Sequence, residues 1–239
     1  MPEHANEFGQ PIGEPVPGWT ARPLPHGRTL AGRYCRLEAL DPARHAQEVF
    51  AALRSARDDR DWTYMAVGPF SSAAEFEVWI REAASGTDPQ HYAVIDHRSG
   101  RAVGTLSLMR QDPANGVIEV GNVMFSPLLK RTTVATEAQL LLMTHVFDDL
   151  GYRRYEWKCD SRNAPSRRAA ERLGFGYEGT FRQAVVYKGR SRDTAWYSII
   201  NSEWPTLRQS FASWLEPANF DNDGRQRRSL AEIRADIRA

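Results

Sequence analysis

The sequence predicts an α/β (α+β) fold, with a mixed central sheet of about seven strands and flanking helices. Three observations support this prediction. Three β-rich runs in the middle of the chain are joined by short turns, a long amphipathic helix follows them, and a strand, a short helix and a β-hairpin complete the order. With 239 residues, of which 41% are hydrophobic, the chain has enough material for the core of one mid-sized domain.

Composition divides the chain into three parts. Residues 1–29 hold six prolines and four glycines without sustained periodicity, which predicts an irregular arm. Residues 30–203 should form the folded domain. Residues 204–239 should form a C-terminal helix, marked by aromatic residues at 204, 211 and 214, and then a charged tail that we expect to be mobile beyond residue 220.

Several protein classes are disfavoured. No apolar run approaches the roughly 20 residues that a bilayer requires, and the first residues lack the basic and apolar regions of a secretory signal, so we expect a cytoplasmic protein without membrane contact. Cys35 and Cys159 belong to no CxxC motif, and the six histidines form no HExxH motif. We therefore expect two buried, reduced thiols and no metal site.

Charge is unevenly distributed along the chain. The net charge of +1 argues against a nucleic-acid partner. However, residues 153–192 contain eleven Lys/Arg and four Asp/Glu, so this segment carries +7 and the remainder carries −6. Two interpretations stay open at this point, a solvated cationic face and a surface that attracts a polyanionic ligand.

The elements before the meander have clear start signals. A short strand is expected at residues 33–38. Asp41 and Pro42 are suited to the N-cap and first position of a helix that continues to about Arg54. Ser72 and Glu75 have capping-box spacing and should begin a second helix that ends near residue 84.

Three strands should then form an antiparallel meander. Residues 91–96 and 101–110 flank a turn at 97–100, and residues 112–116 form a second turn before a strand at 117–125. Asn, Asp, Gly and Pro in these connections are the residue types that tight turns favour.

The long helix is predicted from apolar residues that recur every four positions before Gly151. These residues are Val134, Ala138, Leu142, Val146 and Leu150. A strand at 152–159 and a short helix at 165–173, which Gly174 closes, follow it. The last predicted element is a hairpin of residues 177–187 and 194–200.

Two motifs lie in the second half of the domain. Residues 123–127 (Val-Met-Phe-Ser-Pro) lead into residues 131–138 (Arg-Thr-Thr-Val-Ala-Thr-Glu-Ala), and residues 163–175 place Asn163, Ser166, Glu171 and a Gly-Phe pair at fixed spacing. The first motif resembles the core of GNAT acyltransferases. The second is similar to the NxxSxxxxExxGF signature of the RimJ/RimL-like branch, which acetylates the N-termini of ribosomal proteins. The resemblance covers roughly residues 30–203.

The resemblance implies an acetyl-CoA-dependent N-acetyltransferase that transfers an acetyl group to a primary amine by direct attack in a ternary complex. It also implies a splayed strand pair whose free backbone groups, at residues 121–125, bind the pantetheine of acyl-CoA. Residues 130–136 open the long helix, whose N-terminus suits a pyrophosphate. The residues expected to bind the cofactor are Val123, Met124, Phe125, Lys130, Arg131, Thr132, Thr133, Val134, Ala135, Thr136, Asn163, Arg167 and Arg168.

The pyrophosphate loop departs from the family pattern. The superfamily usually has Q/R-x-x-G-x-G/A; Arg131 matches it, but Val134 and Thr136 occupy the glycine positions. We therefore expect pyrophosphate binding that is weaker or differently shaped. The alternative for this loop is a simple helix N-terminus with threonine capping.

The resemblance suggests two catalytic residues. Ser166 would donate a proton to the departing thiolate, and Glu119 would accept the proton of the amine through water. Asp193 and Glu178 are weaker candidates for the base. Asn163 has an alternative role as a helix cap, and Glu119 as an ordinary solvated strand residue.

The acceptor remains open between a protein N-terminal α-amine and a small-molecule amine. Trp62 and Tyr64 lie in an Asp-rich stretch and are the expected substrate-binding residues. The rival hypotheses are a non-catalytic acyl-CoA-binding module and a structural domain without a cofactor. The C-terminal aromatic residues and the N-terminal arm suggest a homodimer.

Overall fold

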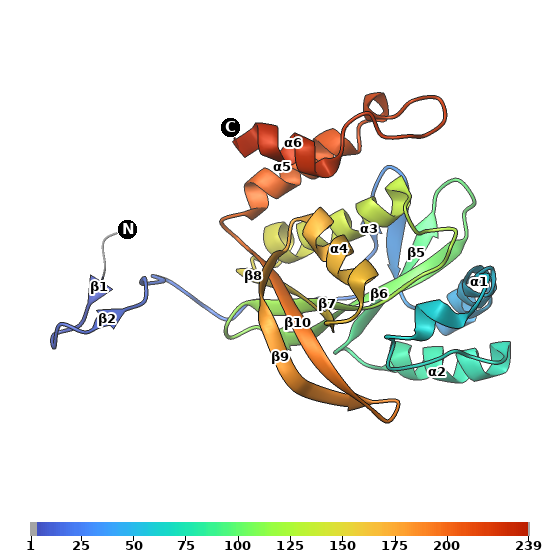
Figure 1. Cartoon of the computed structure of the whole chain (residues 1–239), viewed down its shortest axis with the longest axis horizontal. Helices are drawn as coiled ribbons and strands as arrows, with labels where there is room; N and C mark the ends of the chain where they lie inside the picture. The colour runs from blue at the N-terminus through green and yellow to red at the C-terminus, as the bar shows by residue number, and fades with distance from the viewer. Residues whose placement is uncertain (1–3, 239) are drawn as a thin grey trace.

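The computed structural model describes residues 4–238 and contains an eight-stranded mixed sheet (Figure 1). The strand order is β3-β4-β5-β6-β7-β8-β10-β9. Its strands are β3 (Leu30–Ala31), β4 (Cys35–Ala39), β5 (Gln90–Asp96), β6 (Ala102–Asp112), β7 (Val117–Phe125), β8 (Arg154–Asp160), β9 (Gly176–Tyr187) and β10 (Arg190–Ile200). The α/β prediction is confirmed, and the two-residue β3 is the strand beyond the expected seven.

Neighbouring strands of this sheet are antiparallel except β7 and β8, which are parallel. A parallel pair needs a crossover connection, which here is α3 (Thr133–Thr144) and the π-helical turn η2 (His145–Asp149). The expected helix therefore continues to the predicted end near Gly151, but its last turn is π-helical.

Helices cover both faces of the sheet. One face packs against α1 (Pro42–Arg54) and α2 (Ala73–Ser85), which are joined through the short helix η1 (Asp59–Trp62). The other face packs against α3 and α4 (Ala164–Leu173). Successive residues of β5 point to opposite faces of the sheet. Val94 packs in the core on the α3 side, and Ala93 packs in the core on the α1 side.

The predicted helix boundaries are confirmed by local hydrogen bonds. The side chain of Asp41 accepts a hydrogen bond from the backbone of Ala43, and Ser72 accepts one from Glu75. Gly174 ends α4 with a φ of 103°, a left-handed conformation that a residue without Cβ adopts easily.

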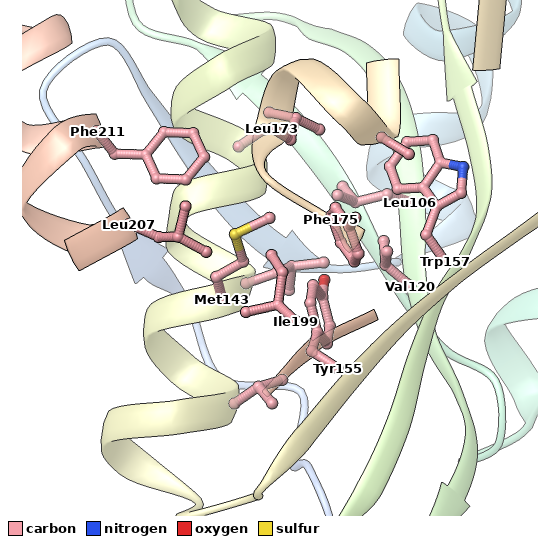
Figure 2. Close-up of a cluster of buried hydrophobic side chains, with 14 of the residues drawn as sticks. Leu106, Val120, Met143, Tyr155, Trp157, Leu173, Phe175, Ile199, Leu207 and Phe211 are labelled. Atoms are coloured by element: carbon pink, nitrogen blue, oxygen red, sulfur yellow. The ribbon is translucent and has the colours of Figure 1, made fainter. Parts of the chain in front are cut away.

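The larger core lies between the sheet and the helices α3, α4 and α5 (Trp204–Trp214). Figure 2 shows Phe211 and Leu207 of α5 beside Met143 of α3, with Ile199 and Tyr155 of the sheet close to them. Trp204 also stacks on Phe147, with ring centroids 5.1 Å apart. The C-terminal aromatic residues therefore pack on their own domain.

The expectation of a mobile tail beyond residue 220 is wrong for residues 221–238. After the short helix η3 (Pro217–Asn219), the chain forms α6 (Leu230–Arg238), which packs on α5. Leu230 and Ile233 are buried there. These two apolar residues, three positions apart, give the charged segment one apolar helix face, which the composition alone does not show.

The N-terminal arm is largely irregular, as expected, within its described residues 4–29. It contains one small hairpin of two-residue strands, β1 (His4–Ala5) and β2 (Pro11–Ile12). Residues 1–3 of the predicted arm and residue 239 of the predicted tail lie outside the described residues. Within residues 4–238, no helix is long and apolar enough to cross a membrane.

Candidate active site

The parallel strands β7 and β8 separate partway along their length. Their register ends at the pair Val120 and Trp157, although β7 continues to Phe125 and β8 to Asp160. Residues 121–125 still pair with β6 on one side, so their other edge faces the opening between β7 and β8. The splay that the family resemblance implies is therefore present.

A bulge in β7 shapes this opening. Asn122 has a φ of 48°, and its side-chain amide donates a hydrogen bond to Ser107 Oγ at 3.2 Å. Ser107 Oγ in turn donates to the carbonyl of Gly121 at 3.0 Å. These two bonds hold the irregular backbone in place at the point where the strands diverge.

The N-terminus of α3 offers unbonded backbone amides. Thr132 is the N-cap, and its Oγ1 accepts a hydrogen bond from the backbone of Ala135 at 3.2 Å. The N–H groups of Thr133 and Val134 precede the first intrahelical bond and have no acceptor within residues 4–238. They carry the positive end of the helix dipole, which suits an anion.

The two side chains at the expected glycine positions are directed toward the protein. Val134 packs against the larger core. Thr136 is buried, and its Oγ1 accepts a hydrogen bond from Arg172 Nη1 at 3.2 Å. Because Val134 packs partly on the core and Thr136 is buried, the free amides of this loop remain open to a pyrophosphate group.

The basic residues of the loop have different surroundings. Arg131 is exposed and adopts a φ of 62°. Lys130 instead forms an ion pair of 2.5 Å with Asp61 of η1. From the opposite side, Lys188 Nζ, in the β9–β10 turn, donates to the backbone carbonyl of Trp62 at 2.8 Å. The η1 segment, residues 59–67, is therefore held between the pyrophosphate loop and the hairpin.

Trp62 and Tyr64 differ in their packing. The ring of Trp62 contacts Phe70 edge-on, with centroids 5.4 Å apart, and a Cβ at Gly68 would collide with this ring. Trp62 thus belongs to the small aromatic core under η1. Tyr64 is half-buried and lies near Tyr187 at the end of β9, where burial and a 2.9 Å hydrogen bond to Asp160 raise the pKa of Tyr187 to about 12.

Glu119 lies on the sheet face opposite α3, beside a buried lysine. The Nζ of Lys158 is 3.0 Å from Glu119 Oε2 and 2.7 Å from Glu156 Oε2, and the side chains of Lys158 and Glu119 are each 7% exposed. The Lys158 ammonium also lies 3.7 Å from the ring centroid of Trp196. A buried cation is thus enclosed by two carboxylates and an aromatic face.

This contact is the centre of a charge row whose signs alternate across the sheet. Its members, in spatial order, are Arg110, Glu119, Lys158, Glu156, Arg154 and Glu178. Arg154 donates two hydrogen bonds to Glu178, at 2.7 and 2.5 Å, and they hold the pKa of that carboxyl at about 2. Burial instead raises the pKa of Glu119, an effect that Lys158 and Arg110 only partly offset. Of these two carboxylates, Glu119 therefore has the pKa better suited to a general base.

Ser166 comes from the other face of the sheet. Its Oγ accepts a hydrogen bond from Trp157 Nε1 at 3.0 Å, and its backbone N–H donates to the side chain of Asn163 at 3.1 Å. Trp157 contacts Ser166 and the next residue, Lys158, contacts Glu119. Because successive strand residues point to opposite faces of the sheet, Ser166 and Glu119 lie on opposite sides of the opening. The capping role of Asn163 is present in the structure.

Within residues 4–238, neither of the two α4 arginines predicted to bind the cofactor forms a hydrogen bond or ion pair with the pyrophosphate loop. Arg167 donates to Tyr197 Oη at 3.0 Å and to the carbonyl of Ser161. Arg168 is exposed. Arg172, which sequence reasoning did not single out, is the α4 residue that reaches the loop, through Thr136.

Sequence reasoning also missed Lys158, Glu156 and Trp196. A signal was available, because polar residues occupy every second position of β8 and apolar residues the positions between. The polar residues are Arg154, Glu156, Lys158 and Asp160. Such alternation indicates one polar and one apolar sheet face, but it does not show that the polar face is buried. Within residues 4–238, no group of three or more His, Cys, Asp and Glu residues is arranged to hold a metal ion.

Known proteins share this architecture. The family model described as "Acetyltransferase (GNAT) domain" matches residues 35–176. The crystal structure of a GCN5-related N-acetyltransferase from Brucella melitensis is 51% identical and has a TM-score of 0.90, covering 92% of this chain and 100% of that chain. The crystal structure of a probable GNAT-family acetyltransferase from Chromobacterium violaceum ATCC 12472 is 40% identical and has a TM-score of 0.76, covering 82% of this chain and 98% of that chain. A Bacillus subtilis (strain 168) protein named "Putative ribosomal N-acetyltransferase YdaF" is 27% identical over 147 residues, 60% of this chain and 78% of the relative.

Proposed function

This chain belongs to the GNAT acetyltransferase family, and we propose that it transfers the acetyl group of acetyl-CoA to a primary amine by direct attack in a ternary complex. One observation carries the proposal. The opening between β7 and β8 has Glu119 on one sheet face and Ser166, with the free amides of α3, on the other.

Acetyl-CoA would lie in this opening, with the chain's backbone as its main partner. The free edge of residues 121–125 suits the pantetheine amides, and the N–H groups of Thr133 and Val134 suit the pyrophosphate. Exposed Arg131 adds positive charge next to these amides. When bound, acetyl-CoA supplies the thioester carbonyl that an amine attacks.

Two side chains would move protons during the transfer. Glu119 Oε accepts a proton from the acceptor ammonium, directly or through one water, and its raised pKa makes it a better base than an exposed glutamate. Ser166 Oγ receives the hydrogen bond of Trp157 and also contacts the Cys159 thiol, so its O–H would turn from Cys159 to the departing sulfur. Lys158 lowers the pKa of Glu119 and so offsets part of the effect of burial.

The acceptor is either a protein N-terminal α-amine or a small-molecule amine. The motif of residues 163–175 and the name of the YdaF relative support the first class. Against it, Arg182-Gln183-Ala184 is followed by Val185 and Val186, where the RimL-like branch often has a carboxylate. The acceptor test therefore has to include both classes.

Calorimetry with acetyl-CoA, followed by thiol release on addition of amines, tests the proposal. The acceptor panel holds N-terminal peptides in one arm and amino acids, polyamines and aminoglycosides in the other. We expect saturable binding and amine-dependent release that falls sharply in Glu119→Gln. Binding without release for any amine would indicate a non-catalytic acyl-CoA-binding module, and absence of binding would contradict the assignment of the opening.

A further inference from the structure

The first described residues form a hairpin outside the body of the domain. Residues 4–18 are the outer part of the N-terminal arm and are called the arm from here on; they contain β1 and β2, which pair antiparallel. Asn6 Oδ1 accepts hydrogen bonds from the backbone of Phe8 and Gln10 at 3.0 and 2.9 Å, and His4 Nε2 lies 2.7 Å from Glu14 Oε2. Figure 1 shows the arm extending away from the sheet.

This arm presents apolar side chains to solvent. Phe8 is 79% exposed, and Ile12 and Val16 are also exposed. Its hydrogen bonds and ion pairs stay within the arm, apart from a bond between the backbone of Trp19 and the carbonyl of Val16. Because a two-stranded hairpin alone is marginal in water, its apolar side chains call for a covering surface.

Trp19 attaches the arm to one end of β8. Its Nε1 donates to the carbonyl of Ala114 at 2.7 Å, and the guanidinium groups of Arg22 and Arg153 lie 4.3 and 5.8 Å from its ring centroid. The position from which the arm leaves the domain is therefore defined by packing.

A second uncovered surface lies on the β9–β10 hairpin. β9 is an edge strand that pairs only with β10. Val186 is 79% exposed, and three further apolar residues of this strand are exposed. These are Tyr177, Phe181 and Val185. An exposed edge strand with apolar residues is a site at which another chain can pack.

The two surfaces are complementary in charge. The arm contains Glu7 and Glu14 and no Lys or Arg. The hairpin tip, residues 181–192, contains four cations and no acid. These cations are Arg182, Lys188, Arg190 and Arg192, and none of them forms an ion pair with a carboxylate within residues 4–238. Apolar contact with opposite charges around it is typical of protein interfaces.

The arm and the tip of the same chain are poorly placed to meet. Trp19 is attached beside Arg153, at the start of β8, whereas Tyr187 near the tip bonds Asp160 at the end of β8. Seven strand residues separate these ends by about 20 Å. A turn between Val16 and Trp19 bends the chain where the arm leaves the domain, and Figure 1 shows the arm directed away from the β9–β10 hairpin.

We propose that the arm of one copy packs against the β9–β10 hairpin of a second copy, which gives a symmetric dimer with two identical contacts. Phe8 and Ile12 cover Val186, while Glu7 and Glu14 face the cations of the tip. Two different surfaces that fit each other close into a dimer when the two copies are related by a two-fold axis, and otherwise they form a ring or a filament. Of the two features that suggested a dimer, this contact uses the N-terminal arm, whereas the C-terminal aromatic residues are covered by their own domain.

Sedimentation velocity over a range of concentrations tests the dimer. The full chain should sediment as a dimer that dissociates more readily at high salt, because screening weakens the ionic part of the contact. Deletion of residues 4–17 should give a monomer with an unchanged melting temperature, since the arm touches little of its own domain. Val186→Glu should weaken association at least about tenfold. The matched control is Val78→Glu, which changes another exposed valine, on α2.

A mixing experiment tests which surfaces meet. The arm-deleted chain keeps the hairpin, and the Val186→Glu chain keeps the arm. At a concentration at which neither variant associates alone, a mixture should therefore form a heterodimer through one intact contact. A full chain that stays monomeric, or an arm-deleted chain that dimerises as the full chain does, would overturn the proposal. Concentration-independent protection of arm amides in hydrogen exchange would show docking within one chain and would also overturn it. None of these measurements depends on acetyl transfer, so they fail or succeed separately from the proposed function.

Discussion

Replacing Lys158 by Met should shift the pH dependence of the reaction. Glu119 can accept a proton only when it is ionised, so kcat/KM should fall as the pH drops through the pKa of Glu119. That pKa lies above its ordinary value of 4.5, because burial outweighs the nearby cations. Removing the buried cation should raise it further and move the acid limb of the pH profile upward.

The size of the shift follows from the contact. A separation of 3.0 Å between Lys158 Nζ and Glu119 Oε2, at an effective dielectric constant of about 20, corresponds to about 5 kcal/mol, or about 4 pKa units. Arg110 remains near Glu119, and water that enters the vacated space screens the carboxylate. We therefore expect the acid limb to rise by about 2 units.

Arg110→Gln is the matched control. Arg110 Nε lies 3.2 Å from Glu119 Oε2, but its side chain is 60% exposed, so solvent screens this pair. Its removal should move the acid limb by about half a unit or less. Glu156→Gln should move the limb downward, because the charge of Glu156 raises the pKa of Glu119.

The assay is thiol release at saturating acetyl-CoA, with kcat/KM measured from pH 5 to 9. Loss of a buried ion-pair partner costs about 3–5 kcal/mol of stability, so each variant is first checked by its thermal melt and circular dichroism. Lys158→Arg keeps the charge and should keep the acid limb. A folded Lys158→Met enzyme with an unchanged acid limb would refute Glu119 as the base.

Three further predictions concern other parts of the molecule. The side chain of Glu137 accepts backbone hydrogen bonds from three consecutive residues, 33 to 35, at 2.8, 2.6 and 2.7 Å. Glu137→Gln should therefore lower the free energy of unfolding, measured by urea denaturation, by about 3 kcal/mol. The control, Glu216→Gln at an exposed position, should change it by less than about 0.5 kcal/mol. Ser166→Ala should lower kcat by about 10²-fold with nearly unchanged acetyl-CoA affinity in calorimetry, and a wild-type kcat would exclude its role as the acid. Leu230 of α6 is 1% exposed, so Leu230→Ala should lower the free energy of unfolding by about 2–4 kcal/mol in the same urea experiment. Leu128→Ala changes an exposed leucine and should leave the free energy of unfolding nearly unchanged.

The parts of this protein that follow from its sequence are those with local causes. Asp41, Ser72 and Gly174 start or end helices through bonds and dihedral angles within a few residues, so their patterns identify them directly. The four-residue spacing of the apolar residues of α3 likewise reflects which side chains face a core. The resemblance to the family then located the opening beside residues 121–125.

The parts that only the tertiary structure decided depend on which distant residues meet. Glu119 and Lys158 come from strands joined by a crossover, and their contact is set by the register between β7 and β8. The pairing of Lys130 with Asp61 depends on where η1 lies over the sheet. Periodicity indicates that a residue faces inward or outward, but the energy of a charge depends on its neighbours and on the water around it, which the chain acquires only when it folds.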